Sequence, residues 1–540
     1  MSYSIYPPNR HACKNISSIL ITEVHISILG KRTNSYVAFF PPTACYLPNT
    51  RYPSPKNTSA CPSMVPVMPY IATSNLIGPV YHLPSMRRNL AASKALSTNR
   101  EEHAGDVASW RATENALSLS TRVVHPKSAG AFDPYDATGP PLYQTATFGQ
   151  PGATEGAEYD YTRSGNPTRQ LFEDACASLE GADRGLAFAS GMAALSAVLR
   201  LASVGSHVVA GDDLYGGTSR LLSTVAPAAG IEVTNVDTTN VETFKKALRP
   251  GETTLVFLES PTNPRMRVCD LRACITAAKE AGALVCVDNS MLPILFCRPL
   301  DLGADICMTS VTKFIGGHSD VTGGLLTVKG AELAQRLKNT QNSEGAILGP
   351  MDSWLAVRGL RTMDVRMRRQ VYNCERLARY VAAHPLCTHI NYAGLPSSPD
   401  YKLQMSQAEN AGSLFSFTTG NLAASKAIVE HTKLYKTTVS FGSVTSQISL
   451  PCFMSHASIP AAVRAERGLV DDLVRISAGV EDIGDLLADL DQAMMRAMEA
   501  AGMEPTSYLD ATTKGLSERE ATLEAKVRTL EQRLREIEGN

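Results

Sequence analysis

The sequence predicts an α/β fold, with a mostly parallel sheet covered by helices on both faces. Three observations predict it. Short apolar runs alternate with helix-like segments along the middle of the chain, several of these runs end in an acidic residue followed by turn residues, and 540 residues are enough for two or more domains. Repeated strand–helix–strand units form parallel sheets. Because ligands bind where the carboxyl ends of such strands open, we expect a site at that edge.

The predicted elements follow one another along the middle of the chain. One helix is expected over 270–282, where Asp270 is suited to cap the start and Gly282 the end. Another helical pattern opens at Ser190-Gly191. Strands are expected at the short apolar runs that open the segments "RGLAFASGMAALSAVLRLA" (184–202) and "SHVVAGDDLYGGTSRLLSTV" (206–225), and at the runs 254–259, 283–288 and 304–310.

The stretch "SVTKFIGGHSD" (310–320) places Lys313 just after the last of these strands. A lysine at the mouth of a buried strand is costly to desolvate, and burial lowers the pKa of its ammonium group. The resulting amine is suited to act as a base or to form a Schiff base, whereas a solvated lysine beside a glycine pair is the ordinary alternative. We interpret His318 as an ordinary hydrogen-bonded histidine, with a catalytic base as the alternative. A metal role lacks support, because no second His or Cys lies at metal-ligand spacing.

Further polar groups fall at the same predicted edge. They are Asp288 and Tyr215 at two strand ends, Ser190, Gly191 and Met192 at a helix start, and the hydroxyls of Ser310 and Thr312. The backbone amides of a helix start attract an anion. Hydrogen-bond donors for a phosphate, a lysine, a carboxylate and an aromatic ring together are typical of a site for pyridoxal 5'-phosphate (PLP). Each group alone is explained equally well as a turn, a cap or a solvated residue, and it is their joint order along the chain that predicts the cofactor.

The composition excludes several other classes. The chain is 44% apolar and 19% charged, and its net charge of −1 gives no reason to expect nucleic acid or an acidic membrane as partner. No uninterrupted apolar run approaches the ~18 residues that cross a bilayer. The 12 cysteines form no CxxC pair, which indicates buried thiols rather than a disulfide framework or a metal site.

The two ends of the chain differ from the middle. The first hundred residues carry ten Lys and Arg against one acid, Glu23, and are rich in Ser, Thr, Asn and Pro. This composition is typical of an organelle transit peptide, with a disordered tail or an overlong start as alternatives. Near the other end, apolar residues from Leu516 to Ile537 follow steps of 7, 4, 3, 4 and 3. This heptad pattern indicates a short coiled coil or a solvated single helix.

Seven motifs resemble those of the Cys/Met-metabolism PLP-dependent enzymes, which have PLP fold type I. They are "YDYTRSGNPTR" (159–169), "FASGMAAL" (188–195), "GDDLYGG" (211–217), "ESPTNP" (259–264), "VDNS" (287–290), "SVTKFIGGHSDVTGG" (310–324) and "RISAGVEDIGDLLADLDQA" (475–493). The resemblance runs from about residue 118 to about residue 497 and implies a seven-stranded type of sheet. Three further segments, 141–148, 341–345 and 440–464, resemble the plant-type members that cleave cystathionine by β-elimination.

The resemblance implies a role for each matched cofactor residue. Lys313 matches the Schiff-base lysine and catalytic base, Asp288 the partner of the pyridine nitrogen, and Tyr215 the tyrosine stacked on the ring. The matched phosphate contacts are Gly191, Met192, Ser310 and Thr312, and Asn263 matches an asparagine near the phenolic oxygen of the cofactor.

The remaining matched residues concern the substrate and a second subunit. Arg475, helped by Ser440, matches the arginine that holds the substrate carboxylate, for which a planar guanidinium is well suited. Tyr161 and Arg163 match a pair that reaches into the phosphate site of the neighbouring subunit. Either Tyr161 or Tyr215 would assist proton transfer, and the sequence leaves open which.

One departure from the family concerns the reaction. The γ-acting members read Glu-Ser-Leu-Gly-Gly where this chain has "VSFGS" (439–443), so Val439 stands in place of their glutamate. Losing that carboxylate favours β-elimination of L-cystathionine to homocysteine, pyruvate and ammonia in methionine biosynthesis, although valine also simply fills volume. The alternatives are a cystathionine γ-synthase or γ-lyase of the same family and, more remotely, an inactive PLP-fold scaffold.

The resemblance also implies an organisation for the whole chain. The expected core consists of a large PLP-binding domain (160–375) and a smaller C-terminal α/β domain (376–505). A targeting or disordered extension (1–104) and an arm that contacts the neighbouring subunit (105–159) precede this core. A linker with a short coiled-coil-like tail (506–540) follows it. A homotetramer built as a dimer of dimers is expected. The plant-type resemblance favours the chloroplast stroma, with the cytoplasm as the alternative.

Overall fold

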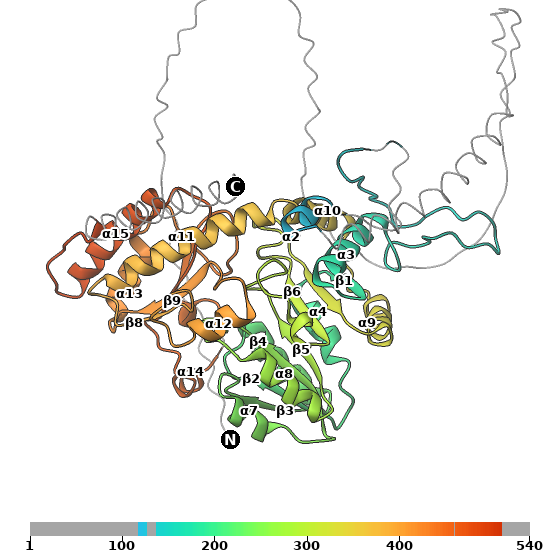
Figure 1. The fold of residues 1–540 in the computed structure, drawn as a ribbon, viewed down its shortest axis with the longest axis horizontal. Coiled ribbons are helices and arrows are strands. Elements are labelled where there is room, and N and C mark those ends of the chain that lie inside the picture. The colour runs from blue at the N-terminus through green and yellow to red at the C-terminus, as the bar shows by residue number, and fades with distance from the viewer. Residues whose placement is uncertain (1–116, 127–134, 136, 458, 510–540) are drawn as a thin grey trace, which may run out of the picture. The chain divides into compact units, whose positions relative to one another are not determined.

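The computed structural model describes residues 117–126, 135, 137–457 and 459–509. The predicted transit segment and the heptad segment 516–537 lie outside these residues. The described part contains two sheets, each packed against helices through its own apolar core (Figure 1). None of the described helices combines the length and the apolar character needed to cross a membrane.

The larger sheet has seven strands in the order β1-β7-β6-β5-β4-β2-β3. Strands β3, β2, β4, β5 and β6 are parallel, and β7 is antiparallel to its neighbours β6 and β1. The bounds are β1 Arg184–Phe188, β2 His207–Gly211, β3 Glu232–Val236, β4 Thr253–Glu259, β5 Leu284–Asp288, β6 Ile306–Ser310 and β7 Gly324–Val328. The predicted mostly parallel sheet is therefore confirmed, with β7 as the exception.

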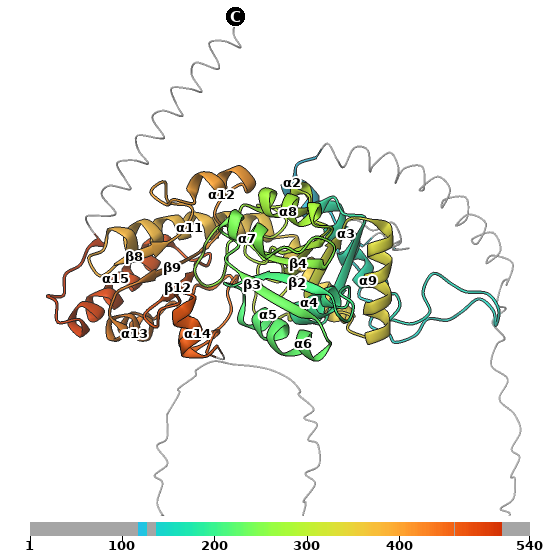
Figure 2. The ribbon, with the colours of Figure 1, turned by 90° about the horizontal axis from the view of Figure 1, so that it is seen from below.

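Helices cover both faces of this sheet, because alternate strand residues enter two separate cores. In β4, Val256 and Leu258 enter one core, whereas Leu255 and Phe257 enter the other. Figure 2 shows α7 and α8 on one side of the sheet and α5 and α6 on the opposite side. The first face packs against α3 (Pro167–Glu180), α7 (Val241–Ala247) and α8 (Leu271–Glu280), and the second against α4 (Gly191–Leu199), α5 (Gly216–Arg220), the π-helical turn η1 (Leu221–Val225), α6 (Ala226–Ala228) and α9 (Ala331–Glu344).

Two predicted helix starts are capped by their own side chains. Asp270 accepts a hydrogen bond from the amide of Ala273 (3.0 Å) at the start of α8. Ser190 does the same for Ala193 (3.0 Å) at the start of α4. Because the amides of a first helical turn have no partner inside the helix, those of Gly191 and Met192 stay available to a ligand.

The smaller sheet has five strands in the order β10-β11-β12-β9-β8. Their bounds are β8 His389–Asn391, β9 Leu414–Thr418, β10 Lys436–Thr437, β11 Gln447–Ser449 and β12 Val474–Ser477, and its core includes α13 (Leu422–His431) and α15 (Ile483–Ala500). In β12, Val474 and Ile476 enter this core. The alternation of a strand therefore turns Arg475 and Ser477 to the opposite face.

The helix α11 (Met363–Ala383) belongs to both cores. Met363 and Met367 pack with the seven-stranded sheet, whereas Leu377 and Val381 pack with the five-stranded sheet. The predicted division at 375/376 falls inside this helix and stays a prediction. The remaining elements are α2 (Leu119–Val124), α10 (Pro350–Leu360), α12 (Tyr401–Gln407), α14 (Ala461–Glu466) and the 3₁₀ turns η2 (Pro299–Leu302) and η3 (Pro451–Phe453).

Candidate active site

Lys313 follows the carboxyl end of β6 and meets the loop that precedes β11. Its Nζ donates a hydrogen bond to Ser440 Oγ (2.5 Å) and lies 4.8 Å from the ring centroid of Phe441. Ser440 has φ 89°, an uncommon backbone conformation for a residue with a side chain, and such strain is often found at functional sites. A Cβ at Gly442 would lie 3.0 Å from the Phe314 amide nitrogen, so this loop packs directly on the backbone beside Lys313.

The surroundings of Lys313 favour its neutral amine. Burial and, to a smaller extent, the charge of Arg475 together lower the pKa of Lys313 to about 8, although Asp288 opposes them. This is the direction expected for a lysine at the mouth of a buried strand. Near neutral pH a minor fraction of the amine is therefore unprotonated, far more than for an ordinary lysine.

Asp288 ends β5 and interacts electrostatically with Lys313. Its Oδ1 accepts a hydrogen bond from the amide of Ser290 (2.9 Å). Burial raises the pKa of the Asp288 carboxyl, while Ser290 and Lys313 lower it. Its register partner on β4 is Glu259, a second buried carboxyl, whose pKa is raised well above its ordinary value by burial and by Asp288. A cation placed against Asp288 would be stabilised at this edge.

The start of α4 forms a cradle beside these groups. A Cβ at Gly191 would lie 2.9 Å from Met308 Cε and 3.4 Å from Ser310 Oγ, so the Ser310 hydroxyl lies next to the helix start. The Thr312 hydroxyl is already used within its own turn, where it donates to the Gly323 carbonyl (3.3 Å) and accepts from the Gly323 amide (3.1 Å). Free amides, a hydroxyl and the positive end of a helix are suited to a phosphate group.

Tyr215 provides an aromatic ring next to this cradle. A Cβ at Gly217 would collide with both the Tyr215 ring and the Met192 sulfur, so only glycine lets these two side chains approach. The Tyr215 side chain is 39% exposed, which leaves ring surface available to a ligand. The donor set fits PLP: amides and a hydroxyl for the phosphate, an aromatic ring, an amine and a carboxylate.

Arg475 approaches the same place from the five-stranded sheet. Its Nη1 donates to Asn263 Oδ1 (2.7 Å) and its Nη2 to the Ser440 carbonyl (2.8 Å). Burial lowers the pKa of Arg475 to about 10. Among the described residues, no ion pair includes this guanidinium, although the side chain is only 2% exposed. A buried cation whose hydrogen bonds go to neutral oxygens is suited to bind a carboxylate.

Comparison with known proteins identifies this combination of groups. The model of the family described as Cys/Met metabolism PLP-dependent enzyme matches residues 120–495. The chain belongs to this family.

Three relatives illustrate the similarity of this Cys/Met-metabolism PLP-dependent enzyme to characterised proteins. A chloroplastic cystathionine β-lyase of Arabidopsis thaliana is 55% identical, over 70% of this chain and 80% of that protein. A protein of the same name from Mimosa pudica is 53% identical, over 67% and 79%. The crystal structure of cystathionine γ-synthase from Xanthomonas oryzae pv. oryzae, in complex with aminoacrylate and cysteine, superposes with a TM-score of 0.69 at 36% identity, covering 71% of this chain and 99% of that one.

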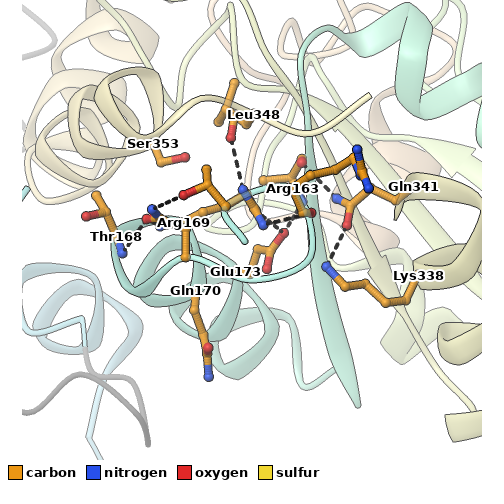
Figure 3. Close-up of polar contacts among 12 residues, drawn as sticks. Arg163, Thr168, Arg169, Gln170, Glu173, Lys338, Gln341, Leu348 and Ser353 are labelled. Carbon is orange, nitrogen blue, oxygen red and sulfur yellow. Dashed lines mark hydrogen bonds and ion pairs between the residues drawn. The ribbon is translucent and has the colours of Figure 1, made fainter. Parts of the chain in front are cut away.

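Tyr161 and Arg163, which are predicted to reach the phosphate site of a neighbouring subunit, lie away from Lys313 of their own chain. Tyr161 is 42% exposed, and the Arg163 guanidinium lies 5.1 Å from the centroid of its ring. Within the described residues, no hydrogen bond, ion pair or ring contact joins Tyr161 or Arg163 to the groups around Lys313. Figure 3 shows Arg163 next to the buried Arg169, which donates to the Arg163 carbonyl (3.3 Å) and so anchors this turn.

Several site neighbours were not among the predicted residues. They are Glu259, Asp213, Phe441 and His456. Glu259 had a visible signal, since it is the acid at the end of the β4 run. For Phe441 and His456 the sequence offered no such signal, except that both lie in the segment 440–464, which resembles plant-type members of the family. Only the tertiary structure brings that segment against β4 and β6.

No metal centre is found in the part of the chain that the structure describes: no three His, Cys, Asp or Glu side chains there are arranged to hold an ion. His318 donates from Nδ1 to the Gly316 carbonyl (2.8 Å) and is exposed. The nine cysteines of the described residues are all free, and eight of them are buried.

Proposed function

We propose that this protein is a cystathionine β-lyase, a PLP-dependent carbon–sulfur lyase that converts L-cystathionine to homocysteine, pyruvate and ammonia. The observation that carries this proposal is the geometry at Ser440. Its hydroxyl accepts from the Lys313 amine and its carbonyl accepts from the Arg475 guanidinium. A substrate carboxylate held by Arg475 therefore has its α-carbon close to the Lys313 amine. The identity to plant relatives named cystathionine β-lyase supports the choice of substrate.

In the proposed mechanism, PLP supplies an electron sink for the α-carbon of the bound amino acid. Lys313 would hold the cofactor, and the neutral amine of its Nζ would serve as the base for the α-proton of the substrate. Asp288 would stabilise a positive charge on the ring nitrogen of the cofactor. Arg475 fixes the substrate carboxylate in two parallel hydrogen bonds. The homocysteine thiolate leaves from the β-carbon, and the remaining three-carbon unit is hydrolysed to pyruvate and ammonia.

The roles of the other predicted residues belong to this proposal. Gly191, Met192 and Ser310 would hold the phosphate, with Thr312 supporting the turn after Lys313, and Tyr215 would cover the ring. Asn263 would lie near the phenolic oxygen while it orients Arg475. Tyr161 and Arg163, which are exposed in one chain, would complete the phosphate site of a neighbouring subunit. Either Tyr161 or Tyr215 would assist proton transfer.

Val439 favours β- over γ-chemistry. It precedes Ser440 and is 50% exposed, so its side chain does not serve as core packing. A glutamate there would place a carboxylate next to the residue that contacts Lys313 and Arg475, where it would attract the distal amino group of cystathionine. Valine lacks that attraction. The γ-acting alternative is supported by similarity to relatives and solved structures named γ-lyase or γ-synthase, at lower identity than the two plant β-lyase relatives.

Product analysis with L-cystathionine tests the proposal. A β-lyase releases equal amounts of pyruvate and homocysteine, whereas a γ-lyase releases 2-oxobutyrate and cysteine. A predominance of 2-oxobutyrate, or synthesis of cystathionine from cysteine and an activated homoserine, would overturn the assignment.

The assembly and location are also proposals. A homotetramer made of two dimers, with the arm 105–159 crossing between subunits, would bring Tyr161 and Arg163 to a second site, and light scattering of the purified protein measures its mass. The two plant relatives named chloroplastic support a plastid location, and more specifically the stroma, with the cytoplasm as the alternative. Fractionation of tagged full-length protein distinguishes these compartments.

A further inference from the structure

Two turns border the candidate active site, and each contributes one of its residues. The turn 212–216 after β2 carries Tyr215, and the turn 260–264 after β4 carries Asn263. Asn263 in turn holds Arg475 through a 2.7 Å hydrogen bond. The position of the Asn263 turn therefore helps to fix the direction of the Arg475 guanidinium, together with the Ser440 carbonyl.

The carboxyl of Glu259 binds backbone amides of both turns. Its Oε2 accepts a hydrogen bond from the amide of Tyr215 (3.0 Å), and the amide of Asn263 donates to the same carboxyl group. Glu259 is 5% exposed, and no ion pair of the described residues includes it. A buried carboxyl is expensive to retain unless it satisfies specific donors, and here the donors belong to the two turns.

The imidazole of His456 binds backbone carbonyls of the same two turns. Its Nε2 donates to the Asn263 carbonyl (3.2 Å), and a second backbone hydrogen bond joins the ring to Leu214. The Ser455 hydroxyl donates to Nδ1 (2.9 Å) and so fixes the tautomer. Burial, together with the charge of Arg475, lowers the pKa of His456 to about 4, so the ring is neutral near neutral pH.

We propose that Glu259 and His456 are positioning residues that hold the Tyr215 turn and the Asn263 turn together and thereby orient Arg475. We call this pair the turn clamp. Glu259 binds the turns through their amides and comes from β4, whereas His456 binds them through their carbonyls and comes from the segment after β11. The clamp thus links the seven-stranded part of the site to the segment that follows the Lys313-contacting loop. It rests on the proposed function, because it assigns Arg475 to the substrate carboxylate.

Weakening the clamp should impair substrate binding more than the chemical step. If the Asn263 peptide is released, its side chain no longer holds Arg475 Nη1, and the guanidinium loses its fixed direction. In the described structure no side-chain hydrogen bond joins Lys313 or Asp288 to Glu259 or His456, although Asp288 is the register partner of Glu259 on β5. We therefore expect KM for cystathionine to rise about tenfold, the size of one lost buried hydrogen bond, while kcat changes less than about threefold.

Four variants separate positioning from general stability. His456→Leu keeps the volume but removes the donor, whereas His456→Gln keeps a donor near the Nε2 position and should restore most of the wild-type KM. Glu259→Gln leaves a single acceptor oxygen for the amides of Tyr215 and Asn263. This variant tests the clamp even if His456→Leu fails to fold. The matched control is Asp489→Asn in α15, whose carboxyl also accepts two backbone amides, from Lys433 (2.9 Å) and Leu434 (2.8 Å), outside the site.

The kinetic test is read against this control. The clamp predicts that His456→Leu and Glu259→Gln raise KM about tenfold, and that Asp489→Asn lowers the Tm without raising KM. A KM within twofold of wild type in both clamp variants, or an equal rise in Asp489→Asn, would overturn the clamp.

A second readout needs neither cofactor nor substrate. Hydrogen–deuterium exchange of the cofactor-free protein should be about tenfold faster over 260–267 in His456→Leu and Glu259→Gln, and unchanged there in Asp489→Asn. Unchanged exchange in the clamp variants would contradict the proposal. If the wild-type protein did not cleave cystathionine, the proposed function alone would fail, and the exchange measurement would still decide whether the two turns are held by Glu259 and His456.

Discussion

Two arginines of this protein are equally buried but differ in what surrounds them. Arg169 in α3 is 1% exposed and lies 3.7 Å from the carboxylate of Glu173, in a network that also contains Gln341 and Lys338 (Figure 3). Arg475 in β12 is 2% exposed, donates hydrogen bonds to the neutral oxygens of Asn263 and Ser440, and lies 5.5 Å from the ring centroid of Phe441, with no ion pair among the described residues. The first guanidinium has its counter-charge within the chain, and the second does not.

The difference distinguishes a structural charge from a functional one. A buried ion pair is complete, and removing one partner leaves the other uncompensated. A buried cation without a carboxylate is costly in the folded protein and becomes favourable when a ligand brings the negative charge. The same holds for Lys313, whose pKa is lowered because burial and Arg475 outweigh the opposing charge of Asp288. The comparison therefore marks the end of β6 and β12, rather than α3, as the place of chemistry.

The largest effect is expected for Lys313→Ala. If this substitution did not affect activity, the assignment of the unpaired charges around Lys313 to the active site would be wrong. The substitution removes both the amine that binds the cofactor and the general base, so pyruvate formation should fall at least about 10⁴-fold. The visible absorbance of the lysine-bound cofactor should disappear as well. A variant that retained a near-normal rate would show that Lys313 is not the reactive lysine.

The next effect concerns the structural charge. Glu173→Gln should lower the free energy of unfolding by about 3 kcal/mol, because Arg169 is left buried without its carboxylate while the acceptor for the Ala187 amide is kept. Denaturant unfolding of the cofactor-free protein measures this change. KM of the folded variant should stay within twofold of wild type, and a selective loss of substrate affinity would contradict the structural assignment.

Arg475→Ala should show the opposite pattern. Without the guanidinium that we propose to bind the substrate carboxylate, kcat/KM for cystathionine should fall about 10²-fold. The unfolding free energy should change little or increase, since an uncompensated buried charge is removed. Parallel kinetics and unfolding curves check both expectations. Strong destabilisation with unchanged kinetics would reverse the roles that we assign to the two arginines.

A smaller effect is expected at the residue before Ser440. Val439→Glu supplies a carboxylate close to Arg475 and Lys313, and should shift the ratio of 2-oxobutyrate to pyruvate toward γ-products by about tenfold. Val439→Gln is the matched control, because it adds similar volume without charge. Equal product ratios in the two variants would mean that volume, and not charge, matters at this position.

The smallest effect is a pH dependence of the rate at which Lys313 captures PLP, which follows from the lowered pKa of this lysine. The pKa of Lys313 is lowered from 10.5 to about 8, so the neutral amine predominates above that pH and becomes scarcer below it. Capture of PLP by the cofactor-free protein should therefore speed up severalfold between about pH 7 and about pH 9 and then level off. Stopped-flow absorbance measures the rate. A rate that kept rising toward pH 10.5 would indicate an ordinary, solvated lysine.

Much of the site was accessible from the chain alone, because its residues lie where strands end. The runs that became β2, β5 and β6 ended beside Tyr215, Asp288 and Lys313, and a parallel sheet brings such ends together. The start of α4 was also recognisable, since Ser190 is a good cap and is followed by glycine. These features depend on local periodicity and on residue types, and both can be read in sequence order.

The tertiary structure decided which distant groups share the site. Arg475 meets Asn263 across 212 positions only because β12 packs its other face into the helices of the second sheet. Glu259 stands beside Asp288 because of the register between β4 and β5. Ser440 reaches Lys313 through a backbone with positive φ that only surrounding packing maintains. Register, packing and strain depend on contacts between segments far apart in the chain, so no pattern within one segment determines them.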